Sequence, residues 1–177
     1  PHEGSIVTHV GGAGMTGGDW QKGSLVNMRG QRFWEENQSD YDFLAAAMSS
    51  VILNPDSPTD ARRVGGPIWA IFDADAVAGT KWNVAYPDVD IAGGRFFSGN
   101  TISELAGKIV NKYFDTTKMS ATVLQDSVSR YNSFVDKGVD EDFNKPKPLF
   151  KLQKHPFYAA WATPCPHDTL TGRRRNR

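Results

Sequence analysis

The sequence predicts an α+β fold in which a small sheet packs against helices. The run 67–73 is almost continuously apolar, which is typical of a buried strand. Segments 101–113 and 120–138 carry apolar residues at helical spacing, and the aromatic run 156–161 predicts a second strand. Because the elements follow the order β, α, β, α, α, β without strict βαβ alternation, we favour α+β over a doubly wound sheet.

Before residue 54 the pattern predicts a glycine-rich segment, a hairpin and a helix. Residues 1–23 are rich in glycine and show no regular pattern. Residues 25–34 are predicted to form a hairpin in which Gly30 takes a backbone conformation that other residues disfavour. Ser39 is an N-cap candidate for the helix that follows. The apolar residues that recur at spacings of three and four in this helix are Tyr41, Leu44, Met48 and Val51.

The later elements are marked by their turn and capping residues. Residues 54–66, rich in proline, aspartate and serine, predict a surface loop before the buried strand. Thr101 and Glu104 form a capping box that begins one helix. Ser120 is the N-cap candidate of a longer helix that ends at Gly138. The apolar stripe of that longer helix consists of Leu124, Val128, Tyr131 and Val135.

Charge and length restrict the function classes. Lys and Arg number 20 and Asp and Glu number 20, so neither nucleic acid nor an anionic membrane is the expected main partner. Only the tail 173–177 is basic, and we interpret it as a solvated charge run. The sequence contains no apolar run that approaches the length needed to cross a bilayer, about 20 residues, and no leader pattern at its start. We therefore expect a soluble protein.

Cysteine and histidine usage argues against disulfides and metal sites. The single Cys165 excludes an intramolecular disulfide and a Cys-based metal cluster, so we expect a reducing, cytoplasmic location. The acidic run 140–142 lacks the ligand spacing and the central glycine of a calcium loop, and we interpret it as a solvated turn. We predict no metal site, since no two histidines have the helical spacing of metal ligands. The histidines are His2, His9, His155 and His167.

Two further patterns give weak support for chemistry. Residues 12–17 match the dinucleotide fingerprint, but glycine recurs after them and no helical periodicity follows, so we favour a flexible loop. Glu35 and Glu36 are adjacent, and on a strand adjacent side chains point to opposite faces. We therefore do not expect them to act as paired carboxylates.

The segment after the aromatic run is the most promising site. His167 follows Pro166 and is followed by Asp168, Thr169 and Gly172. An imidazole, a carboxylate and a hydroxyl on a constrained loop are suited to holding a polar substrate. The alternative is that His167 is an ordinary loop histidine.

Ordered segments across residues 24–172 resemble one family of enzymes. The resemblance is to the FAD-dependent oxidoreductases related to fumarate reductase and ketosteroid dehydrogenase. The segments that carry it are Leu25–Asn27, Gly30–Phe33 with Glu36, Asp40–Phe43 with Ala47–Met48, Ile68–Asp73, Thr101–Ala106, Tyr131–Val135, Gly138–Phe143, Pro156–Ala160 and His167–Gly172.

The resemblance implies a specific domain. In that family this stretch is a substrate-binding cap, an α+β domain with a mixed or antiparallel sheet and packed helices, inserted into a larger FAD-binding domain. We therefore expect residues 24–172 to be the cap, a small molecule to be the substrate, and the missing FAD-binding domain to be the partner. The isolated chain is expected to bind FAD poorly and to be inactive. Because the chain begins at Pro1, we expect a processed product, an excised domain or an incomplete record.

The resemblance also implies roles for five residues. His167 falls where fumarate reductase relatives place a histidine that binds a substrate carboxylate, and Thr169 and Gly172 belong to the same segment. Tyr41 coincides with a tyrosine that ketosteroid dehydrogenases use in proton abstraction, with Asp40 beside it. Fumarate reductases carry an arginine near this position and this chain does not, which argues against a true fumarate reductase. The competing interpretation of Tyr41 is a core residue, because it begins the helical stripe.

Two rival functions remain open. The chain is either the cap described above, a non-catalytic binding or assembly module derived from such a domain, or a complete enzyme in which residues 12–17 form a degenerate nucleotide loop. A module is expected to be indifferent to flavin, whereas in a complete enzyme the substitution Gly14→Val would abolish cofactor binding.

Overall fold

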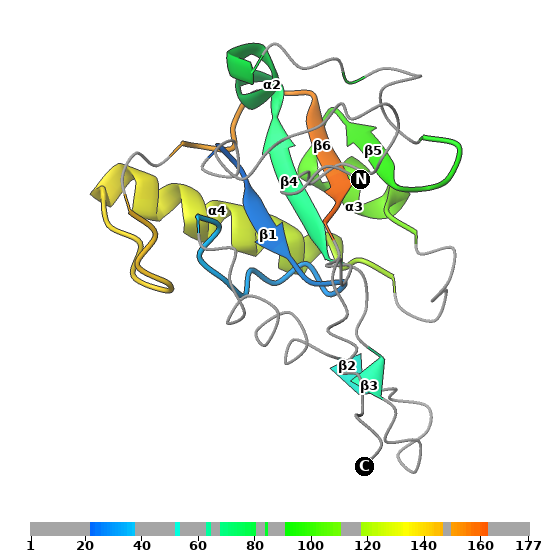
Figure 1. The fold of residues 1–177 in the computed structure, drawn as a ribbon, viewed down its shortest axis with the longest axis horizontal. Coiled ribbons are helices and arrows are strands. Elements are labelled where there is room, and N and C mark those ends of the chain that lie inside the picture. Colours follow the sequence, from blue (N-terminus) through cyan, green and yellow to red (C-terminus); the bar gives the residue numbers. More distant parts are fainter. Residues whose placement is uncertain are drawn as a thin grey trace, which may run out of the picture.

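The structure is a computed structural model of the chain (Figure 1). It describes residues 22–37, 52–53, 63–64, 68–80, 84, 91–110, 118–146 and 150–162.

Four antiparallel strands form the central sheet in the order β1-β4-β6-β5. They are β1 (Ser24–Val26), β4 (Trp69–Asp73), β6 (Phe157–Trp161) and β5 (Phe96–Gly99). Figure 1 shows β6, drawn in orange, between β4 and β5 although it lies far from both in the sequence. The strands predicted at 67–73 and 156–161 are confirmed, whereas β5 was not predicted.

A second, two-stranded antiparallel sheet consists of β2 (Ile52–Leu53) and β3 (Arg63–Val64). Its register pairs residue 52 with residue 64 and residue 53 with residue 63. The segment 54–66 was predicted to be a surface loop, and that prediction is wrong at residues 63–64 because they pair with a strand.

The predicted hairpin at 25–34 forms only in part. Val26 pairs with Arg32 in an isolated bridge, and the strand partner of β1 is β4 instead. Asn27 Oδ1 accepts hydrogen bonds from two backbone N–H groups of the intervening turn, at 3.0 and 3.1 Å. Gly30 has a φ of 88°, the left-handed conformation that its lack of a side chain allows. The turn therefore forms as predicted, but it does not lead into a second strand.

Three helices are described: α2 (Ala74–Thr80), α3 (Ile102–Lys108) and α4 (Ala121–Lys137). The predicted caps are confirmed. Thr101 Oγ1 accepts from the Glu104 N–H at 3.0 Å, Ser120 Oγ caps α4, and Gly138 ends α4 with a φ of 72°. None of these helices in the described part of the chain combines the length and apolar character that crossing a bilayer requires.

Apolar side chains fill both faces of the central sheet. Trp69 and Ile71 of β4 pack with Leu105 and with residues of α4 on one face. On the other face Phe72 stacks on Tyr158, with ring centroids 5.4 Å apart. Because β4 contributes to two cores, its sequence is continuously apolar although its neighbours are antiparallel. The observed fold is α+β, as predicted.

Candidate functional site

The site residues predicted from the sequence lie outside the described residues. They are Asp40, Tyr41, His167, Thr169 and Gly172. The glycine-rich segment 12–17 and the predicted helix from Ser39 also lie outside them. The structure does describe the two segments that lead to these residues along the chain, and the candidate site is built from those segments.

The sheet brings these two leading segments close together. In sequence, the chain leaves β1 after Val26 on its way to Asp40, and leaves β6 after Trp161 on its way to His167. Val26 and Trp161 both pair with Trp69 at the start of β4. Since neighbouring strands lie about 4.8 Å apart, the two exit points are separated by about 10 Å.

Arg32, in the first of these segments, lies at the centre of a buried ion cluster. Its guanidinium donates from Nε and Nη2 to Glu36, with both distances 2.8 Å, and from Nη1 and Nη2 to Asp140, at 2.9 and 2.7 Å. The guanidinium carbon lies 5.1 Å from the ring centroid of Tyr131 and 5.0 Å from that of Phe143. Two bidentate contacts and two aromatic faces therefore hold one side chain.

Lys145 completes the cluster. Its Nζ lies 3.2 Å from Glu36 Oε2 and donates to the Gly23 carbonyl at 2.9 Å and to the Tyr131 hydroxyl at 3.1 Å. Arg32, Glu36, Asp140 and Lys145 are hereafter called the buried ion cluster. Their side chains are 5%, 1%, 0% and 0% exposed, so two positive and two negative charges balance one another inside the protein.

Asp140 also organises its own loop. Its carboxylate accepts hydrogen bonds from the backbone N–H groups of Asp142 at 3.1 Å, Phe143 at 3.3 Å and Lys145 at 3.1 Å. The run 140–142 was interpreted as a solvated turn, and that interpretation is wrong for Asp140, which is 1% exposed. The sequence places Asp140 among other charged residues, but its guanidinium partner is 108 residues away.

Burial and charge act in opposite directions on these groups. Desolvation opposes the charge of Glu36, but the charge of Lys145 and the hydrogen bonds and charge of Arg32 outweigh it and hold the pKa of Glu36 below its ordinary value. In the same way, hydrogen bonds from Arg32 overcome desolvation and lower the pKa of Asp140. Burial also opposes the charge of Arg32, yet its bonds to the two carboxylates raise its pKa. Burial raises the pKa of the Tyr131 hydroxyl.

The buried ion cluster is therefore a structural clamp. Its carboxylates are held ionised and the Tyr131 hydroxyl is held neutral, so none of them is poised to exchange a proton near neutral pH. The clamp joins the start of β1, the turn at 32–36, α4 and the loop at 140–145. It thereby fixes the turn that precedes Asp40 and Tyr41 in the sequence.

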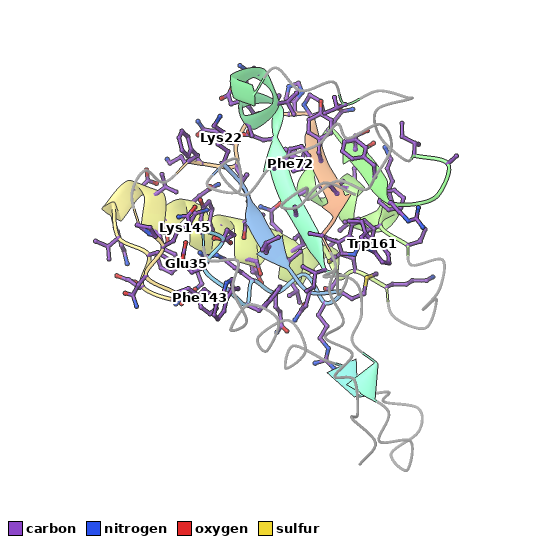
Figure 2. The ribbon with its side chains drawn as sticks, viewed as in Figure 1. Lys22, Glu35, Phe72, Phe143, Lys145 and Trp161 are labelled. Carbon is purple, nitrogen blue, oxygen red and sulfur yellow. The ribbon has the colours of Figure 1, made fainter. Side chains whose placement is uncertain are left out.

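Glu35 and Asn37 flank Glu36 but do not belong to the clamp. Glu35 Oε1 accepts from the Asn37 backbone N–H at 2.8 Å. Three buried atoms have no hydrogen-bond partner among the described residues: Glu35 Oε2, Asn37 Oδ1 and Asn37 Nδ2. Figure 2 labels Glu35 together with Phe143 and Lys145, which come from the segments that the clamp joins. Of the adjacent acidic pair noted in the sequence, Glu36 therefore belongs to the clamp, whereas Glu35 has one carboxylate oxygen without a partner in the described part of the chain.

Another buried carboxylate, that of Asp73, holds the other end of the sheet. Asp73 Oδ1 accepts from the backbone N–H groups of Asp75 and Ala76, with both distances 3.1 Å. Its Oδ2 accepts from those of Gln153 at 3.0 Å and Lys154 at 2.9 Å. Asp73 thus caps α2 and ties the end of β4 to the segment before β6.

The described helices that follow strands do not present a full set of free N-terminal N–H groups to a phosphate. The carboxylate of Asp73 accepts from the N–H groups of Asp75 and Ala76 in α2, and Thr101 Oγ1 accepts from that of Glu104 in α3. Nor does this part of the chain contain a group of three or more His, Cys, Asp or Glu side chains arranged to hold a metal ion.

Curated relatives of the chain are oxidoreductases, whereas no protein-family profile matches it. An NADH:acrylate oxidoreductase of Vibrio harveyi is 30% identical over 150 residues, covering 84% of this chain and 13% of the relative. A 3-oxosteroid 1-dehydrogenase of Mycolicibacterium smegmatis is 28% identical, covering 84% and 28%. A digoxin reductase of Eggerthella lenta is 27% identical, covering 86% and 25%. The chain thus spans between about an eighth and a little over a quarter of these relatives.

Solved structures share the fold. A 3-ketosteroid Δ1-dehydrogenase from Sterolibacterium denitrificans matches with a TM-score of 0.63 at 23% identity, over 90% of this chain and 30% of that one. An open flavocytochrome c3 fumarate reductase matches with a TM-score of 0.58 at 20% identity, over 84% and 22%. A fumarate reductase flavoprotein subunit from Lactobacillus plantarum, solved by NMR in solution, matches with a TM-score of 0.55 at 14% identity, over 92% and 93%.

The sequence relatives and the structural neighbours agree with one another and with the ordered motifs of the chain. They include reductases and dehydrogenases, and this chain corresponds to a part of most of them. The chain is therefore similar, in sequence over most of its own length and in fold, to the FAD-dependent oxidoreductases that include the fumarate reductases and the 3-ketosteroid dehydrogenases.

Proposed function

We propose that residues 24–172 are the substrate-binding cap of an FAD-dependent dehydrogenase or reductase that acts on a C–C bond next to a carbonyl or carboxylate. The observation that carries this proposal is the share of each chain that the common fold spans. The α+β fold accounts for 90% of this chain but only 30% of a 3-ketosteroid Δ1-dehydrogenase. FAD, which supplies the redox chemistry, would then be bound by the rest of a longer protein.

In this proposal residues 1–23 and 173–177 are flanking segments and the cap contributes two groups of side chains. His167 and Thr169 donate hydrogen bonds to the carbonyl or carboxylate oxygen of the substrate and stabilise negative charge on it. Gly172 allows the backbone to approach closely. Tyr41, with Asp40 beside it, moves a proton at the neighbouring carbon.

The described structure supports convergence of these two groups. The segments that lead to Tyr41 and His167 leave the sheet about 10 Å apart, beside the start of β4. The buried ion cluster fixes the first of these segments, and pairing with both β4 and β5 fixes β6. Rigid elements therefore precede both proposed halves of the site in the sequence, which favours precise positioning.

The proposal is tested on two proteins. The full-length polypeptide that contains this chain is expected to purify with flavin absorbance and to reduce or dehydrogenate an enone or enoate. The 177-residue chain alone is expected to bind FAD poorly in a fluorescence titration and to show no turnover. Tight FAD binding by the isolated chain, or a full-length protein without flavin, would overturn the proposal.

A further inference from the structure

The three unpartnered atoms of Glu35 and Asn37 form a polar set within one turn of the chain. Glu35 is 4% exposed, and its Oε2, like the carboxamide Oδ1 and Nδ2 of Asn37, is buried without a hydrogen-bond partner in the described segments. The backbone bond from Asn37 N–H to Glu35 Oε1 at 2.8 Å holds the two side chains in one turn. The set offers two acceptor oxygens and one N–H₂ donor.

Such a set is costly to keep in a folded protein. Buried polar atoms are almost always bonded, and each exception calls for an explanation, such as a catalytic role or a bound water or ion. The nearby cations do not satisfy Glu35, because Arg32 directs its donors at Glu36 and Asp140, and Lys145 contacts Glu36. The turn thus keeps the Glu35 carboxylate outside the buried ion cluster, whose own charges balance one another.

We propose that Glu35 and Asn37 form a specificity subsite that accepts an uncharged hydrogen-bond donor, a hydroxyl or an amide N–H, and rejects a carboxylate. This inference rests on the proposed function and names the substrate class: an α,β-unsaturated ketone or amide that carries a donor, rather than an enoate whose carboxylate lies at this end. The donor bonds to Glu35 Oε2 and to Asn37 Oδ1, while the Asn37 N–H₂ donates to an oxygen of the same ligand.

Burial sharpens this selection. Charges repel one another more strongly where water is excluded, so a ligand carboxylate beside Glu35 is penalised far more than it would be at the surface. A neutral amide of the same size avoids this repulsion and also satisfies the acceptors that are otherwise unpaired. The selection is therefore made by charge and not by shape.

The position of the subsite in the chain agrees with a role in substrate binding. Asn37 precedes Tyr41 by four residues, a stretch that spans at most about 14 Å. The turn is held by Glu36, which lies between the two subsite residues and is fixed in the buried ion cluster. A donor bound at Glu35 would then lie at one end of a molecule whose reacting carbon approaches Tyr41.

The test compares two inert ligands of the same carbon skeleton, propionamide and propionate, by NMR titration of the isotope-labelled 177-residue chain. The wild type is expected to bind propionamide at least about tenfold more tightly than propionate, with the largest shift at the Asn37 side-chain amide. Glu35→Gln keeps an oxygen for the Asn37 N–H but removes the charge. It is expected to reduce the preference to about threefold or less, a loss of about half of the logarithmic selectivity.

A matched substitution controls for the general loss of one charge. Glu141→Gln removes an exposed carboxylate that pairs with Lys137 at 2.9 Å and is expected to leave the preference unchanged. Equal affinities in the wild type, shifts confined to other residues, an unchanged preference in Glu35→Gln, or an ordered water as the sole occupant would each overturn the inference. The flavin content and turnover of the full-length protein test the proposed function separately.

Discussion

Arg32 and Asp140 lie 108 residues apart in the sequence and form a bidentate ion pair, with N–O distances of 2.9 and 2.7 Å, inside the protein. The pair joins the turn that precedes the proposed proton-transfer residues to the loop that follows α4. Because Nε and Nη2 of the same guanidinium also donate to Glu36, one side chain fixes two carboxylates at once.

Arg32→Met is expected to destabilise the protein by about 3–5 kcal/mol, because it leaves buried carboxylates without their cation. Urea unfolding followed by tryptophan fluorescence measures this change. Arg130→Met is the matched control, since Arg130 also forms a bidentate pair, with Asp142 at 2.8 and 2.6 Å, but on the surface. A surface pair contributes little, so comparable losses in the two variants would contradict the buried role of Arg32.

The free energy of unfolding is expected to decrease as the pH is lowered through the acid range. Glu36 and Asp140 have lowered pKa values in the folded protein, against ordinary values of 4.5 and 3.8. Below about pH 4.5 the unfolded chain therefore binds protons that the folded chain does not, and stability is lost progressively until the folded carboxylates also protonate. Unfolding curves from neutral to acid pH measure the slope, and Glu36→Gln should reduce it. An equal slope in the variant would show that other carboxylates cause it.

Asp73→Asn is expected to cost about 1–3 kcal/mol, because an amide group cannot accept from all four backbone N–H groups that the carboxylate holds. Hydrogen exchange at Gln153 and Lys154 should become faster in the variant. Asp75→Asn removes only an exposed pair with Lys154 and should leave both rates unchanged. Unaltered exchange in Asp73→Asn would mean that this carboxylate does not hold the segment.

Two glycine substitutions are expected to have opposite signs. A Cβ at Gly99 would lie 2.6 Å from the backbone nitrogen of Leu105, so Gly99→Ala must displace α3 and should cost about 1–3 kcal/mol. A Cβ at Gly107 meets nothing within 4 Å, so Gly107→Ala within α3 should stabilise by up to about 1 kcal/mol. Thermal unfolding distinguishes them, and a stable Gly99→Ala protein would place α3 farther from β5.

Tyr41→Phe in the full-length enzyme is expected to lower kcat by about 10²–10⁴-fold, because the phenol is the proposed proton-transfer group. Tyr158→Phe is the control, since Tyr158 stacks on Phe72 within the sheet. Steady-state kinetics with an enone substrate provide the measurement. If Tyr41→Phe keeps full activity but loses stability, the helical periodicity has identified Tyr41 correctly as a core residue.

Local patterns predicted the elements whose cause is local. The caps at Thr101 and Ser120 and the left-handed end at Gly138 were all identified from neighbouring residues, since each depends on hydrogen bonds within one turn. The buried strand at 67–73 was identified from its apolar run. The candidate site depended on resemblance, because five separated residues show no periodicity that would bring them together.

By itself, then, the sequence determined where α3 and α4 begin, where α4 ends, which strand is buried and which family the chain resembles. It did not predict α2, and it extended α3 beyond its end at Lys108. The tertiary structure alone decided that β6 lies between β4 and β5, that Asp140 is buried and not solvated, and that Glu36, rather than Glu35, pairs with Arg32 and Lys145. The physical reason is the separation along the chain over which each interaction acts. Capping and periodicity act over a few residues, whereas strand pairing and buried charge compensation join groups whose proximity depends on how the whole chain folds.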